Sequence, residues 1–367
     1  MIYKNNKIAG IYKGNTNIIR AYKGNDLIYD SKIILTVTVK YYQYTVNGVT
    51  YYKMREAPVL STGGRHVSAA IYYRYEKAGS SRNGGFSVHP GSFSFIVEGS
   101  DNYRDWDTSK TLKQVSCPDS NIEVVIDEQI TNITNSWAPP ELAPNGVYFC
   151  YFNPNTEEVM LYSSRVASGV EAMGAALITD NCRICIGLDE IYRVRYLNNT
   201  SLTTAINNGL RVSTQQAQAI TDYNGKQNTE CILRSYPSQA SVGNEEDPGI
   251  ELLSSSTGAN TSHSAAWYCN NYVFPDGQNG YLPAAGELNG IIQNMSRLNT
   301  ILSGIGGTTL NYSITLGNAT GFWCSTAYNA SAAWYALPAG TFAYTSIQNG
   351  TTSSPGLVAR PICSLVN

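Results

Sequence analysis

The pattern of hydrophobic and polar residues along the first half of the chain is that of short β-strands. Residues 33–40 alternate between apolar and polar side chains, which is typical of a strand with one buried face. Residues 41–46 and 49–54 flank Asn47-Gly48, and this dipeptide suits the two positive φ angles of a type I′ hairpin turn. Further strands are expected at 67–75, 86–97, 122–126 and 147–152. Strands at this spacing predict a β-sandwich-like domain, or a pair of small β modules, over residues 33–165, with the boundary linker at 163–170.

Helical periodicity appears only in the second half of the chain. Residues 283–303 place apolar side chains on one stripe, with Pro283 suited to the first turn. The stripe consists of Leu288, Ile291, Ile292, Met295, Leu298, Ile301 and Leu302. Gly304, Gly306 and Gly307 end this helix and are not a phosphate loop, because no Lys-Ser or Lys-Thr follows them. A shorter helix is expected at 262–272, with Ser262 or Ser264 as its cap.

The last fifty residues return to strand patterns. Strands are expected at 321–326, 333–337, 342–347 and 357–365. The whole chain is therefore predicted to be a β-rich α+β protein.

A short repeat opens the chain. Ile11-Tyr12-Lys13-Gly14-Asn15 recurs as Ala21-Tyr22-Lys23-Gly24-Asn25, and each copy is a β-prone run that ends in turn residues. This pattern predicts a β-meander over residues 1–32. The segment is either a docking tip for a larger assembly or a solvated edge whose lysines discourage strand pairing. The repeat resembles the starts of structural proteins from phages and prophages of gut Bacteroides-type bacteria.

Composition and charge narrow the possible partners. Lys plus Arg number 25 and Asp plus Glu 27, so the net charge is -2. Without an excess of positive charge to bind phosphates, nucleic acid is not expected as the main partner. No run of apolar residues is long enough to span a membrane, and the start of the chain lacks the apolar core of a secretory signal. We therefore expect synthesis in a cytoplasm without export by the usual route, and no membrane insertion. The 27 tyrosines favour a contact surface, since Tyr offers large contact area at low entropy cost.

Candidate reactive groups are few. The eight cysteines are widely spaced and are expected to be buried free thiols for the most part. Cys182 and Cys185 form a lone CxxC, and a zinc site would need a second pair or nearby histidines. Asp105-Trp106-Asp107 could pair two carboxylates beside a sugar platform, but a capped loop with a packed Trp is the favoured interpretation.

An ordered series of landmarks over about residues 170–366 resembles a bacterial family with a C-type-lectin fold. This family includes the variable proteins of diversity-generating retroelements and is distantly related in fold to formylglycine-generating enzymes. The landmarks are Tyr223-Asn224-Gly225-Lys226-Gln227-Asn228-Thr229, Ala265-Ala266 with Cys269 and Tyr272, Gly280-Tyr281-Leu282-Pro283 with Glu287-Leu288, Trp323-Cys324-Ser325-Thr326, Ala333-Trp334, Gly340 and Ala359-Arg360-Pro361. The resemblance implies a C-type-lectin-fold domain over residues 166–367, with paired terminal strands, two helices and a small antiparallel sheet.

The resemblance also implies a constant framework that displays exchangeable side chains. The framework positions are Trp323, Trp334, Gly340, Arg360 and Pro361. If Trp334 points inward, a period of two turns Tyr335 and Leu337 outward. The predicted ligand-binding residues are Tyr328, Asn329, Ser331, Tyr335, Leu337, Phe342, Tyr344, Ser346 and Asn349. The alternative is that the N-terminal domain or a neighbouring subunit covers this sheet.

The expected function is binding without catalysis. The protein is expected to be a receptor-binding protein of a phage tail tip, located in the virion, that grips a host cell-surface protein or glycan. Its N-terminus would dock to tail or baseplate proteins, and a homotrimer is expected by analogy with phage fibres. The alternatives are a bacterial surface adhesin of the same fold and, more remotely, an enzyme of the formylglycine-generating type with Cys324 and Cys363. No cofactor is expected, and no calcium, because the Glu-Pro-Asn, Gln-Pro-Asp and Trp-Asn-Asp motifs of animal C-type lectins are absent.

Overall fold

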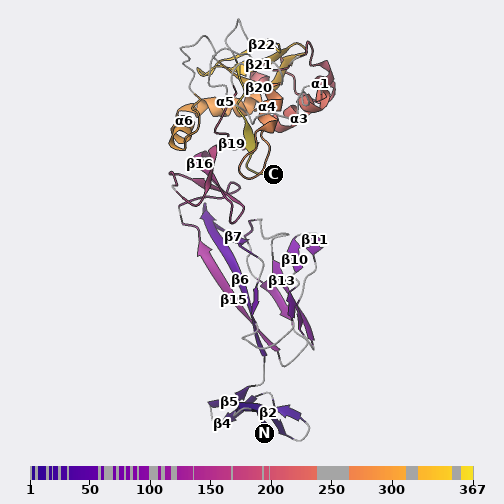
Figure 1. The fold of residues 1–367 in the computed structure, drawn as a ribbon, viewed down its shortest axis with the longest axis vertical. Coiled ribbons are helices and arrows are strands. Elements are labelled where there is room, and N and C mark those ends of the chain that lie inside the picture. The colour runs from indigo at the N-terminus through magenta and orange to yellow at the C-terminus, as the bar shows by residue number, and fades with distance from the viewer. Residues whose placement is uncertain are drawn as a thin grey trace, which may run out of the picture. The chain divides into compact units, whose positions relative to one another are not determined.

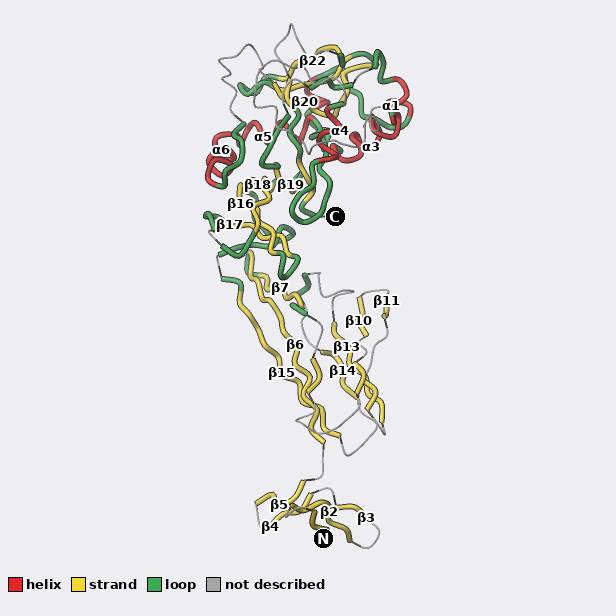
Figure 2. The backbone as a smooth tube through the Cα atoms, in the orientation of Figure 1, coloured by secondary structure: helices red, strands yellow, loops and turns green. Residues whose placement is uncertain are grey.

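In the computed structural model of the whole chain, the backbone contacts divide the protein into two units. They are Met1–Thr134 and Asn135–Asn367. Side chains are described for residues 35–56, 59, 106–108, 125–134 and 136–366, with gaps at 167, 192–193, 198, 238–263, 311–320 and 349–356. Elsewhere, only the strands given below are described. The described elements form a β-rich α+β protein, and its helices all lie in the second unit (Figure 2).

The first unit consists of small sheets (Figure 1). In the N-terminal segment β1 (Ile2–Lys4), β2 (Lys7–Lys13) and β3 (Thr16–Ile18) pair in order, and β4 (Arg20–Lys23) pairs with β5 (Asp26–Asp30). A second group is built on β6 (Ile33–Val46), which pairs with β7 (Val49–Met54), β8 (Val59–Ser61) and β15 (Ile122–Asn132). A third group contains β9 (Ala69–Ile71), β10 (Arg74–Lys77), β11 (Ser80–Arg82), β12 (Phe86–Val88), β13 (Gly91–Glu98) and β14 (Leu112–Ser116).

The hairpin predicted at Asn47-Gly48 is confirmed. Both residues have positive φ, 51° and 77°, and β6 pairs antiparallel with β7 on either side of them. The predicted alternation is also present, because Leu35, Val37 and Val39 are buried while the residues between them are partly exposed. Residues 33–40 and 41–46 are one continuous strand. β15 extends further than predicted and runs parallel to β6.

The Asp105-Trp106-Asp107 segment is described from Trp106 onward. Trp106 meets the ring of Tyr44 edge-on, with ring centroids 6.2 Å apart. Asp107 forms an isolated bridge with Tyr52, through two backbone hydrogen bonds. These contacts are those of a loop that closes over the sheet with a packed Trp.

The second unit starts earlier than the boundary at 165/166 expected from the sequence. β16 (Gly146–Asn153) pairs with β18 (Glu171–Ile178), and β17 (Glu158–Tyr162) pairs with β16. The sheet continues through β19 (Arg183–Ile186) to β24 (Ile362–Ser364) at its other edge. The segment 163–170 is therefore a connection within one sheet, because strands on both of its sides belong to that sheet.

The helices and the second sheet of this unit complete the fold. The helices are α1 (Thr203–Asn207), α2 (Gln216–Ala219), α3 (Gly225–Ser235), α4 (Ala265–Asn271), α5 (Ala285–Gln293) and α6 (Met295–Gly304). The sheet contains β20 (Gly321–Asn329), β21 (Ala332–Ala336), β22 (Phe342–Ser346) and β23 (Leu357–Val358). No helix among the described residues is long and apolar enough to cross a membrane.

The single helix predicted over 283–303 is wrong, because the structure has two. Asn294 ends α5 and precedes α6, with φ −108° and ψ 11°, outside the helical region. Its side-chain Nδ2 donates to the carbonyl of Gly290 at 3.0 Å, and asparagine commonly competes with helix backbone in this way. The predicted apolar stripe is nevertheless buried along both helices. The helix predicted at 262–272 is confirmed as α4, where Ser264 Oγ accepts from the Trp267 N–H at 3.1 Å.

Candidate binding surface

Most of the sheet of β20 to β23 is covered on both faces. Its strand order is β22-β21-β20-β23, so β22 lies at an edge. One face packs against α5, and the other packs against α3, which in turn contacts α1 and α4. The segment 194–197 lies on the same side as α3, and α6 lies against β16 and β18. The first face carries Phe322, Cys324, Trp334, Ala336 and Phe342, and the second carries Trp323, Ala327, Ala333 and Leu357. Burial on both faces fixes the register, since a slip of one residue would exchange the two faces.

Two buried tryptophans attach this sheet to the rest of the unit. The Trp323 Nε1–H donates to the Val194 carbonyl at 2.8 Å, and the Trp334 Nε1–H donates to the Ser213 carbonyl at 2.7 Å. Both indole N–H groups are therefore satisfied inside the protein, as burial requires. These two contacts hold the sheet from opposite faces.

A buried polar network ties α3 to β20. Asp222 Oδ2 accepts from Asn228 Nδ2 and from Thr326 Oγ1, each at 2.8 Å. Asn228 Nδ2 also lies 3.3 Å from Ser325 Oγ. Ser325 and Thr326 are completely buried, so a substrate cannot reach their hydroxyls. The network therefore positions the strand.

Glu287 holds the beginning of α5 from within the core. Its Oε2 accepts from the Ala284 N–H at 2.7 Å, and its Oε1 accepts from the Tyr281 hydroxyl at 3.1 Å. A Cβ on Gly225 would come within 2.2 Å of Oε2, so α3 can start here only with glycine. Burial raises the pKa of Glu287 to about 8, and the hydrogen bonds that it accepts only partly oppose this shift.

The pKa of Glu287 predicts that acid stabilises the second unit. Its pKa in the fold lies above the ordinary value of 4.5, so the folded state keeps a proton that the unfolded chain releases. The stabilisation is fully present below about pH 4.5 and is lost as the pH rises to about 8, by up to about 1.4 kcal/mol per pH unit. Urea unfolding at several pH values measures this effect. In Glu287→Gln the slope should be smaller over this window, and parallel curves for the two proteins would contradict the prediction.

A buried ion pair joins the last part of the chain to the segment that follows β19. Arg360 Nη1 lies 3.2 Å from Glu190 Oε2, and each side chain is 1% exposed. Arg360 Nη2 donates to the carbonyls of Gly187 and Thr308, at 2.6 and 2.9 Å. The planar guanidinium serves several acceptors at once, which a lysine ammonium could not do in the same geometry.

The exposed surface of the sheet includes a pair of stacked tyrosines. The rings of Tyr328 and Tyr344 are nearly parallel, 4° apart, with centroids 3.6 Å apart. Trp334 meets both rings edge-on, at 5.3 Å from Tyr328 and 5.8 Å from Tyr344. Tyr344 is 52% exposed, while Trp334 is buried. We call this pair with its supporting indole the tyrosine stack.

The other predicted ligand-binding residues divide between surface and core. Ser331 and Ser346 are exposed, and Asn329 and Leu337 are partly exposed. Tyr335 is partly exposed but packs edge-on against Trp323, with ring centroids 6.3 Å apart, so it does not simply face outward. Asn349 lies outside the described residues.

The assignment of Phe342 to the binding surface is wrong. Its side chain is buried, in the core that contains α5. Phe342 and Tyr344 do lie on the same face of β22, as the period of two predicts, because their cross-strand partners are Ala336 and Trp334. The helices cover the Phe342 end of this face and leave the Tyr344 end open.

The framework residues lie inside the second unit or at a turn. Trp323, Trp334, Arg360 and Pro361 are buried. Gly340 has φ +89° in the turn between β21 and β22, where the Leu337 N–H donates to the Thr341 carbonyl at 2.8 Å. A side chain is strained at this φ, so glycine is needed there.

Sequence reasoning assigned no role to several buried polar residues. Asp222 and Glu190 gave no signal, because neither stands in a motif and their partners are distant in sequence. Asn228 and Glu287 belong to the landmark segments but carried no predicted role. Among the described residues, no group of three His, Cys, Asp or Glu is placed to hold a metal ion.

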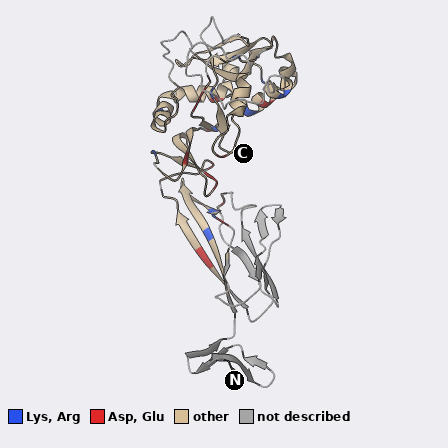
Figure 3. Cartoon of the chain, in the orientation of Figure 1, with Lys and Arg blue, Asp and Glu red and all other residues tan. Residues whose placement is uncertain are grey.

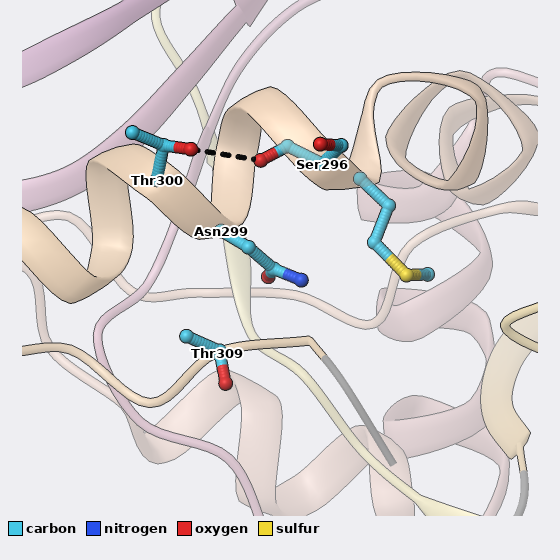
Figure 4. A pocket seen from close by; sticks show the side chains of 5 residues that line it. Ser296, Asn299, Thr300 and Thr309 are labelled. Atoms are coloured by element: carbon cyan, nitrogen blue, oxygen red, sulfur yellow. Dashed lines mark hydrogen bonds between the residues drawn. The ribbon is translucent and has the colours of Figure 1, made fainter.

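Two hollows lie apart from the tyrosine stack. One, of about 390 Å³, is lined by Tyr223, Lys226, Tyr281 and Glu287 among others. The other, of about 570 Å³, lies beside α6 and is lined by Met295, Ser296, Asn299, Thr300 and Thr309 (Figure 4). In the second, Thr300 Oγ1 donates to the Ser296 carbonyl, and Asn299 Oδ1 accepts from the Leu310 N–H. These polar groups serve the protein's own backbone, so we assign them no ligand.

Comparisons with known proteins give little further information. No family model matches the chain, and no curated protein matches it. A solved structure, described as a fimbrial protein from Bacteroides ovatus ATCC 8483, aligns with 90% of this chain and 70% of its own length. The TM-score is 0.32 and the sequence identity is 11%.

Proposed function

We propose that this protein is a receptor-binding protein whose second unit grips a molecule on the surface of a bacterial cell. The observation that carries the proposal is the tyrosine stack, in which the half-exposed Tyr344 ring stacks on Tyr328 at the open edge of the sheet. A tyrosine offers large contact area with few rotatable bonds, so a ring already fixed in place loses little entropy on binding.

We also propose that the second unit has a C-type-lectin fold. Three features support this proposal. β24, near the end of the chain, pairs with β19 in the first sheet of the unit. The longer helices of the unit are α3, α5 and α6, and β20 to β23 form the small second sheet. Framework residues Trp323, Trp334 and Arg360 are buried around that sheet.

Diversification by a retroelement is part of the same proposal. Exchange of side chains is tolerated where they do not pack in the core, which favours Asn329, Ser331, Tyr344 and Ser346 over Phe342. A neighbouring reverse-transcriptase gene and a near-duplicate template are expected at the locus. Close relatives that differ at Phe342 as often as at Tyr344 would contradict this assignment.

In the proposed assembly the N-terminal segment, with β1 to β5, docks to the tail of a phage, and the protein is part of the virion as a homotrimer. Several copies would raise avidity for a weak single site. The alternative is a bacterial surface adhesin with the same second unit. Neighbouring capsid and baseplate genes would favour the phage protein, and neighbouring secretion genes the adhesin.

We propose no catalytic activity. The remote alternative of a formylglycine-generating type of enzyme needs reactive thiols, and Cys324 and Cys363 are both completely buried. Burial raises the pKa of the Cys324 thiol well above its ordinary value, so little nucleophilic thiolate forms. The Cys324 Sγ also lies 3.1 Å from the Trp334 carbonyl, within the sheet.

The proposal predicts that the protein binds intact bacteria through Tyr344. Labelled protein is incubated with a panel of gut Bacteroides-type strains, and bound protein is measured by flow cytometry. Tyr344→Ser should weaken binding to a responsive strain at least about tenfold, the effect of losing a central aromatic contact. The matched control is Val273→Ser, because Val273 is 60% exposed and lies in the loop after α4. Absence of binding to every strain, or equal losses in the two variants, would contradict the proposal.

A further inference from the structure

The surface around the tyrosine stack has an unusual composition. Residues 298–359 contain no Asp, Glu, Lys, Arg or His, and they include every strand of the β20–β23 sheet. Figure 3 shows this sheet without blue or red. An ionic group on a ligand therefore finds no opposite charge on the sheet itself.

The polar side chains of this surface both donate and accept hydrogen bonds. Ser331, Ser346 and Gln348 are exposed, and Asn329 is partly exposed. Hydroxyl and amide groups of this kind match a ligand whose own groups are hydroxyls or amides. The segment that follows Arg211 adds more of them, because the Ser213 carbonyl accepts from Trp334 and residues 215, 216 and 218 are glutamines.

Arg211 is an exposed charged residue that a backbone contact places beside β20. Its carbonyl accepts from the Ala327 N–H at 2.9 Å, and its side chain is exposed. An anionic ligand on this surface would be attracted by the Arg211 guanidinium. Replacing Arg211 therefore tests whether the ligand is charged.

The apolar part of the surface is small. In the described part of the second unit, the large apolar side chains that are well exposed are Tyr344 and Val273. A stable protein interface buries about 800 Å² on each partner around a cluster of apolar anchors. One exposed ring beside hydroxyls and amides instead matches a sugar ring, which presents a face of C–H bonds and an edge of hydroxyls.

We infer that the tyrosine stack binds a neutral saccharide, with one face of the sugar against Tyr344 and its hydroxyls toward the surrounding amides and hydroxyls. This inference rests on the proposed function and specifies its ligand. The recognition uses no ion pair, so binding should change by less than about twofold when NaCl rises from about 0.1 to 1 M. Tyr344→Phe should keep binding within about threefold, because the ring remains and only one hydroxyl is lost.

The test uses the full chain and a bacterial strain that it binds. Cells are treated with periodate, which cleaves vicinal diols, or with proteinase K. Loss of binding after periodate alone supports the inference, and loss after proteinase K alone overturns it while the proposed function stands. Where both treatments abolish binding, free sugars decide. Displacement by glucose, galactose, mannose or N-acetylglucosamine supports the inference, and displacement by none of them overturns it.

Two further outcomes concern charge. Displacement by sialic or glucuronic acid but not by neutral sugars, or a loss of at least about tenfold in Arg211→Gln, would show an anionic ligand and overturn the inference. If the wild-type protein binds no cell at all, the proposed function fails and this inference fails with it. The failure of the inference alone is thus distinguishable from the failure of the proposed function.

Discussion

Replacing Arg360 with leucine is expected to lower the free energy of unfolding of the second unit by about 3–5 kcal/mol. The variant leaves the Glu190 carboxylate inside the protein without the guanidinium that lies 3.2 Å from it. It also removes the donor that serves the carbonyls of Gly187 and Thr308. Desolvation of the remaining charge, rather than the loss of attraction, provides most of this effect, and urea unfolding followed by far-UV circular dichroism measures it.

A second variant separates this cause from simple loss of packing. Adding Glu190→Gln to Arg360→Leu removes the buried negative charge, so the double variant should be more stable than Arg360→Leu alone. The exposed pair Lys40–Glu56 in the first unit, 2.7 Å apart, is the control, and Glu56→Gln should change stability by less than about 1 kcal/mol. If Arg360→Leu lowers the free energy of unfolding by less than about 1 kcal/mol, the prediction that this buried ion pair matters for stability is wrong.

Local features of the fold were predictable because their causes are local. The Asn47-Gly48 turn depends on backbone preferences of two adjacent residues, and the Ser264 cap depends on one hydroxyl and an N–H three residues away. The apolar stripe of α5 and α6 was found because helical periodicity survives a break at one residue. The break itself was not visible, since Asn294 keeps the stripe in register while leaving helical φ and ψ.

Features that depend on distant pairing were not predictable. β16 belongs to the second unit because it pairs with β18, and no property of residues 146–153 alone selects that partner. The Arg360–Glu190 pair joins residues on either side of the helices and the second sheet. At the candidate site, the period of two placed Phe342 and Tyr344 on one face correctly. Periodicity assigns a face, however, and only the packing of the helices decides which part of that face is covered.

Phe342 and Tyr344 therefore form a matched pair for the final prediction. They lie two residues apart on the same face of β22, one buried at 5% exposure and the other 52% exposed. Phe342→Ala is expected to destabilise the second unit by about 3–5 kcal/mol, because it removes a buried aromatic side chain and leaves a cavity against the core that contains α5. Tyr344→Ala removes a half-exposed ring that contacts Tyr328 and the edge of Trp334, so the loss should stay near or below about 1 kcal/mol.

In cell binding the order of the two effects should be reversed, with the larger loss in Tyr344→Ala. At a temperature and pH where both are folded, Phe342→Ala should bind cells within about threefold of the wild type, because the buried Phe342 side chain offers a ligand almost no surface. Tyr344→Ala should lose at least about tenfold. Equal destabilisation by the two variants would show that the Tyr344 end of the face is covered as well. If both variants are folded and both lose binding, then binding also requires the buried residue Phe342. That result would contradict a binding surface that is independent of the core.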